Sequence, residues 1–190
     1  MKPIPFLLAH AAIACHCHGG NLNIVDLGPE KKITLEVDAG KLTQQFSLSY
    51  QEASGFFIIP DKKAALIKVI DSEIPTLKVP SKTTGQIAVL HPAAETFKWS
   101  LYASTPTEGK TSLRLINLTD EEVNISQGDT QLTLKAASEL PVPQVTSAPI
   151  RLSFEAGKKV RPHEQEEPSA VIGFVYKTDA EWKIFYVDDI

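Results

Sequence analysis

The chain has 190 residues, of which 43% are hydrophobic and 22% are charged, as in an ordinary globular protein. This composition excludes disorder of the whole chain, and the length suffices for one generous domain or two small ones. The net charge of −4 comes from 23 acidic and 19 basic residues, and the basic residues are scattered along the sequence. Because binding to nucleic acid needs clustered Lys and Arg to neutralise phosphates, we expect no nucleic-acid partner.

The N-terminal segment is the one place where the composition changes sharply. Lys2 precedes a short apolar run over residues 6–14 that is free of acids and ends in small residues. Small residues in this spacing are typical of a signal peptidase site. We therefore expect residues 1–14 to be a signal peptide and residues 15–21 to be a polar tether. The protein would then be exported to the periplasm, the outer membrane or the cell exterior. An ordinary first strand is the alternative.

Cys15 follows Ala12, Ile13 and Ala14, and these four residues look like the lipobox of bacterial lipoproteins. In a lipobox the Cys thiol takes a diacylglycerol, which would attach the chain to a membrane. The usual pattern has Leu where Ala12 stands, so cleavage nearby without lipid is the alternative. The Cys and His residues at 15–18 are zinc ligand types, but alternate residues fit the usual spacing of a structural site poorly. We predict no metal and no cofactor.

From Leu22 onward the pattern is that of short β-strands. Apolar and polar side chains alternate in four runs, which gives each strand one solvated and one buried face. These runs are 33–37, 46–50, 131–135 and 150–155. Three further runs are apolar on both faces and predict central strands or strands covered on both sides: 56–59, 171–176 and 182–187. The last two are expected to form an antiparallel hairpin.

Turn residues such as Gly40 and Gly128 separate these runs. Short strands between turns predict an all-β fold, an antiparallel β-sandwich over residues 22–190. It is either one sandwich or two packed sub-domains with a proline-rich connection near 141–149. Residues 136–140 form the only helix-like patch, and we find no internal repeat.

Motifs of enzymes are absent from the sequence, which has no Gly-x-Ser-x-Gly turn, no Gly-rich phosphate loop and no His-Glu-x-x-His. We therefore expect no catalytic residue. His91 and Glu95 pair a base with a carboxylate, but a surface loop between two strands is the favoured interpretation. Trp99 and Trp182 are the candidate ligand-binding residues, because an indole can stack on a sugar ring. Packing in the core is the alternative for both.

Between Phe97 and Pro143 the sequence carries Trp99 in a strand, then Arg-Leu-Ile-Asn-Leu-Thr at 114–119, then Val123 and Gly128. On these features the segment resembles a group of uncharacterised exported bacterial proteins with a small immunoglobulin-like β-sandwich. The resemblance implies a fold and export but no reaction. The sequence thus predicts a non-catalytic structural or interaction protein of the bacterial cell envelope, whose partner is another protein. A carbohydrate-type ligand-binding module is the alternative.

Overall fold

The computed structural model describes residues 19–60, 64–81, 84–104, 112–127, 130–142, 153–154, 170–178 and 181–189. These residues form strands and turns, with no helix among them, so the prediction of an all-β protein is confirmed. The predicted signal peptide and Cys15 lie outside the described residues, as do residues 143–149 of the predicted connection.

The first unit spans residues 19–104 and contains two four-stranded sheets. Its strands are β1 (Gly19–Asp26), β2 (Ile33–Asp38), β3 (Thr43–Leu48), β4 (Glu52–Pro60), β5 (Ala65–Val69), β6 (Leu77–Val79), β7 (Gln86–Ala93) and β8 (Thr96–Ala103). One sheet has the order β4-β1-β7-β8, and the other has the order β3-β2-β5-β6. Solvent-inaccessible side chains from both sheets, such as Leu22, Leu35 and Leu90, pack into one core. The two sheets therefore form a β-sandwich.

The second unit spans residues 112–189 and is built in the same way. Its strands are β9 (Ser112–Asn117), β10 (Val123–Gln127), β11 (Thr130–Leu134), β12 (Glu139–Val142), β13 (Ser153–Phe154), β14 (Ala170–Thr178) and β15 (Glu181–Asp188). One sheet has the order β12-β9-β14-β15 and the other β11-β10-β13. Leu113, Leu115 and Leu134 belong to its core. Strands β14 and β15 pair antiparallel, which confirms the predicted hairpin.

The second unit repeats the first, strand for strand, over the described residues that both contain. Strand β9 corresponds to β1, and each pairs in parallel with the first strand of a long hairpin. Equivalent backbone hydrogen bonds join these strands: Leu27 donates to Leu90, and Leu118 donates to Val175, both at 2.8 Å. The expectation of no internal repeat is therefore wrong. The units are also divided between β8 and β9, and the prolines near 141–149 begin inside the second unit, where β12 contains Pro141.

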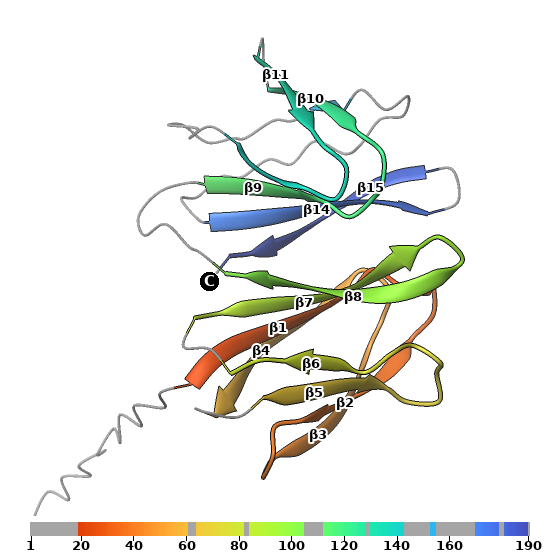
Figure 1. Ribbon diagram of the computed structural model, residues 1–190, viewed down its shortest axis with the longest axis vertical. Helices are drawn as coiled ribbons and strands as arrows, with labels where there is room; N and C mark the ends of the chain where they lie inside the picture. The colour runs from red at the N-terminus through yellow and green to blue at the C-terminus, as the bar shows by residue number, and fades with distance from the viewer. Residues whose placement is uncertain are drawn as a thin grey trace, which may run out of the picture.

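The units pack against each other through the outer faces of the sheets that contain β1 and β9, which are the two middle layers in Figure 1. Buried residues of this junction come in equivalent pairs, one from each unit: Val25 and Ile116, Leu27 and Leu118, Ile87 and Ile172, and Val89 and Phe174. An interface that uses the same surface on both sides is characteristic of a symmetric dimer. Here both halves belong to one chain.

Two sequence predictions fail at the ends of strands. Strand β1 already begins at Gly19, where Gly19 and Gly20 pair with Pro60 and Ile59, so residues 19–21 are not part of a tether. The helix-like patch at 136–140 is a turn followed by the start of β12. There Ala137 has a φ of 46° and its N–H donates to the Thr119 carbonyl, which closes the turn between two strands instead of continuing a helix.

Candidate functional site

Strand β4 lies at the edge of its sheet, although the sequence predicted a central or doubly covered strand at 56–59. Ile59 is buried in the first core and Phe57 packs against it. Phe56 and Ile58 point the other way and remain 44% and 55% exposed. The prediction is therefore wrong, because β4 lies at an edge and its outer face stays partly open at Phe56 and Ile58. An edge strand also directs backbone N–H and C=O groups away from its sheet.

A β-bulge precedes this exposed stretch. Gly55 has a φ of 74°, a conformation that favours glycine, and the register between β1 and β4 shifts between Asn23 and Val25. The Ser54 hydroxyl accepts a hydrogen bond from the Ile24 N–H at 3.0 Å, which satisfies a donor that the bulge would otherwise leave unpaired. Regular pairing resumes at Phe56, so residues 56–60 form the straight part of the edge.

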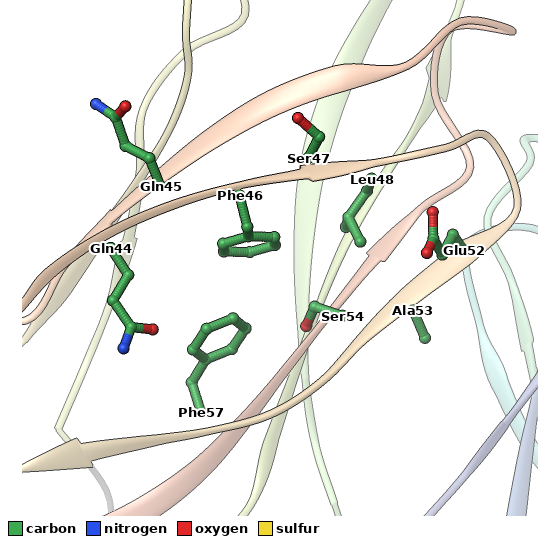
Figure 2. A pocket seen from close by; sticks show the side chains of 9 residues that line it. All are labelled: Gln44, Gln45, Phe46, Ser47, Leu48, Glu52, Ala53, Ser54 and Phe57. Carbon is green, nitrogen blue, oxygen red and sulfur yellow. The ribbon is translucent and has the colours of Figure 1, made fainter.

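A first pocket of about 430 Å³ opens between β3 and β4, the edge strands of the two sheets of the first unit. Figure 2 shows Phe46 from β3 and Phe57 from β4 facing each other in this opening. Their rings stack with centroids 4.8 Å apart and an interplanar angle of 28°. The pocket is thus lined by two aromatic rings that pack partly against the first core, and such a surface suits an apolar side chain.

A second pocket of about 490 Å³ lies on the other side of β4, at the junction between the units. Its lining comes from both units: Asn23, Ala53, Gly55 and Phe56 from the first, and Val171, Tyr186, Val187 and Asp188 from the second. Asn23 is only 4% exposed, and its side-chain oxygen has no hydrogen-bond partner among the described residues. A buried acceptor without a partner costs roughly 1–3 kcal/mol. An occupant that donates a hydrogen bond would remove this cost.

The straight edge of β4 therefore runs between two pockets. Successive side chains of a strand point to opposite faces. A segment that added to β4 would direct alternate side chains toward the first pocket and toward the second. This is the geometry by which sheet edges recognise extended peptides, with affinity from the backbone and selectivity from the pockets.

Trp99 and Trp182 are not brought together, because they belong to different units. Trp99 lies on β8, half-buried against the first core. Trp182 lies on β15, half-buried against the second core, with the Lys177 ammonium 5.4 Å from its ring centroid. Each indole thus packs partly against the core of its own unit.

His91 is buried within β7, so the prediction that it belongs to a surface loop is wrong, whereas Glu95 is exposed in the hairpin turn. The Nε2 atom of His91 lies 2.9 Å from the Ser100 hydroxyl, and its Nδ1 atom lies 3.0 Å from the Pro92 carbonyl. Burial lowers the pKa of His91 to about 4. A histidine that is 1% exposed cannot meet a substrate, so we interpret the pair with Ser100 as a structural hydrogen bond.

Sequence reasoning missed Asn23, although a polar side chain between Leu22 and Ile24 is a visible signal of a special environment. It also missed Phe46 as half of an aromatic pair, since its partner Phe57 lies on another strand. Over the described ranges, we find no group of three His, Cys, Asp or Glu side chains that could hold a metal ion.

Within the part of the chain that the structure describes, no helix is long and apolar enough to cross a membrane. Comparison of the sequence with protein-family models and with curated proteins gives no match.

Proposed function

We propose that this protein is a non-catalytic interaction protein that binds an extended segment of a partner protein, which adds as a strand beside β4. The observation that supports this proposal is the exposed apolar edge at Phe56 and Ile58, with a pocket on either side. Long, exposed, apolar edges are normally avoided because they pair with other chains. An edge of this kind in a folded protein therefore favours a binding role.

The internal repeat provides a comparison for this edge. The equivalent edge strand of the second unit, β12, contains Pro141 at the position that Phe56 occupies in β4. A proline in an edge strand is an ordinary way to prevent pairing with other chains. Strand β4 contains no proline before Pro60. The two units thus differ at the feature to which we assign binding.

We place this activity in the bacterial cell envelope, on the basis of the apolar segment at 6–14 and the lipobox-like sequence that ends at Cys15. Attachment through a lipid on Cys15 and an immunoglobulin-like character of the two sandwiches belong to the same proposal. A carbohydrate-type module is less well supported, because Trp99 and Trp182 are both partly buried against the cores of their units. Strand addition is the function that the geometry favours.

Peptide selection tests the proposal directly. A displayed library of random ten-residue peptides is panned on the immobilised full chain, and the recovered peptides are measured against two variants. Ile58→Lys places a charge on the straight edge of β4. Leu66→Lys is the matched control, because Leu66 is a similarly exposed apolar residue, on β5 of the other sheet.

We expect Ile58→Lys to weaken binding roughly tenfold or more, because a charge buried between β4 and the added strand is unfavourable. Leu66→Lys should leave binding unchanged. Hydrogen exchange should show new protection of amides in β4. Failure to recover any binding peptide would overturn the proposal. So would peptides that bind Ile58→Lys as tightly as the unmodified chain.

A further inference from the structure

The junction between the units has two opposite rims. Arg114 lies at one rim, and the second pocket lies at the other. From β9, its guanidinium donates to the Ala103 carbonyl of the first unit at 2.6 Å. It also donates to the Glu139 carboxylate at 3.0 Å and lies 3.5 Å from the Asp189 carboxylate. The Arg114 side chain is 13% exposed. A largely buried guanidinium therefore joins the end of β8 to the strands of the second unit.

The second pocket lies at the corresponding place on the other rim. By the register of the repeated strands, Asn23 is the equivalent of Arg114, and Asp188 is the equivalent of Ala103. Phe56 pairs with Asn23 as Pro141 pairs with Arg114. Asn23, Phe56 and Asp188 all line the pocket. The pocket is thus the space that a long side chain fills on the opposite rim and that the short Asn23 leaves open.

The lining of this pocket is suited to the same chemical group. Asn23 is 4% exposed, and its side-chain oxygen, a hydrogen-bond acceptor, has no partner within the described ranges. Asp188 adds a carboxylate, and Phe56 adds an aromatic face that is 44% exposed. A guanidinium offers five N–H donors and a flat surface that stacks on aromatic rings. An ammonium offers a compact charge without that flat surface.

We propose that the second pocket receives an arginine side chain from the strand that adds to β4. This inference rests on the proposed function and names the chemistry of the partner. The partner segment has an arginine at the position that faces the unit junction, and an apolar residue at a neighbouring position that faces Phe46 and Phe57. The arginine takes the place that Arg114 takes on the other rim.

The test uses peptides recovered by the selection described above. Each is synthesised with arginine and with citrulline, which has the same shape but carries no charge. Both peptides are measured against the full chain and against the Asn23→Arg variant. In this variant a long side chain from β1 itself should fill the second pocket. Asn124→Arg is the matched control, because it makes the same change at an exposed position on β10. Asp188→Asn is a second variant at an exposed position, so the test does not depend on one substitution that alters packing.

We expect the recovered peptides to be enriched in arginine, and citrulline to weaken binding roughly tenfold, the effect of losing a charge-assisted hydrogen bond. Asn23→Arg should abolish this discrimination, Asp188→Asn should reduce it, and Asn124→Arg should preserve it. In NMR spectra the Asn23 side-chain amide should shift with the arginine peptide and much less with the citrulline peptide.

The possible failures are distinguishable. Peptides that protect β4 in hydrogen exchange but bind equally well with citrulline would overturn the arginine inference and leave strand addition standing. Discrimination that survives in Asn23→Arg would place the arginine elsewhere and overturn the inference as well. Absence of any peptide bound beside β4 would overturn both proposals together.

Discussion

Asn117 in the second unit occupies the position of Asp26 in the first, and only the Asn117 side chain has hydrogen-bond partners for both of its polar atoms. In each unit Oδ1 accepts a backbone N–H two residues later, from Gly28 at 2.9 Å and from Thr119 at 3.0 Å. The Asn117 amide nitrogen also donates to the Glu121 carbonyl at 2.7 Å. The second oxygen of Asp26 is buried and has no partner among the described residues. Burial, assisted by the charge of Glu52, raises the pKa of Asp26 to about 7.

Replacing Asp26 by Asn should therefore stabilise the protein near neutral pH. Because the folded state raises this pKa above its ordinary value of 3.8, Asp26 lowers stability as pH rises from about 4 to 7. The full cost at pH 8 is up to roughly 4 kcal/mol. Urea unfolding at a series of pH values should show a gain for Asp26→Asn that is absent at pH 4 and grows toward pH 8. The reverse change, Asn117→Asp, is the control and should destabilise. Superimposable pH profiles for the first variant and the unmodified chain would contradict the assignment.

His91 should produce the opposite pH dependence. Burial lowers its pKa from 6.5 to about 4 in the folded state, so protonation favours unfolding. Its contribution to stability should be lost as pH falls from about 6.5 to 4 and should change little outside that range. His91→Gln keeps a side chain able to bond with Ser100 but does not titrate. Its urea midpoint should fall less between these two pH values than that of the unmodified chain, and an equal fall would count against His91.

Phe174→Ala should cost roughly 3–5 kcal/mol, as removal of a buried aromatic side chain commonly does. Phe174 is inaccessible to solvent and lies at the junction between the units, with its ring centroid 5.6 Å from that of Tyr102. The variant should also weaken the coupling of the two units, so that thermal unfolding broadens or separates into two transitions. Leu66→Ala, at an exposed position, should change stability by less than about 0.5 kcal/mol. A loss below about 1 kcal/mol for Phe174→Ala would show that the units do not depend on this contact.

Gly173→Ala should destabilise the second unit by roughly 1–3 kcal/mol through overpacking. An added Cβ would lie 2.8 Å from a Leu115 methyl carbon and 3.0 Å from the Tyr186 ring. The equivalent residue of the first unit is Ala88, which is fully buried and already carries this carbon. Chemical denaturation would measure the effect. An unchanged midpoint would mean that Leu115 and Tyr186 rearrange without cost.

Cys15→Ser should release the protein from membranes if the lipobox interpretation is right. Several acyl chains attach a protein stably, because each buried methylene contributes roughly 0.8 kcal/mol. Membrane fractionation and intact mass should show an acylated, membrane-bound wild-type chain and a soluble Cys15→Ser variant. Cys17→Ser is the matched control and should behave as wild type. A soluble wild-type chain without added acyl mass would exclude the lipid anchor, though not export.

The sequence by itself determined the fold class and most strands, because period-2 alternation and turn residues act locally. It also explained Asn117 and Thr119, whose side chains bond each other and the nearby backbone in a turn, as an Asn-x-Thr sequence predicts. The hairpin of β14 and β15 follows from two apolar runs separated by a short polar loop. These features depend on neighbours in the chain, so a pattern of residue types is enough to reveal them.

The tertiary structure alone decided the repeat, the junction and the exposed edge. Similarity between the units is visible mainly in β1 and β9, since elsewhere each position is constrained only to be apolar or polar. An apolar run such as 56–59 has the same pattern whether its outer face is covered or open. Whether Phe56 is covered depends on strands far away in the sequence, and the shared lining of the second pocket by Asn23 and the end of β15 depends on how two units dock. Such relationships arise from long-range packing, which no local pattern encodes.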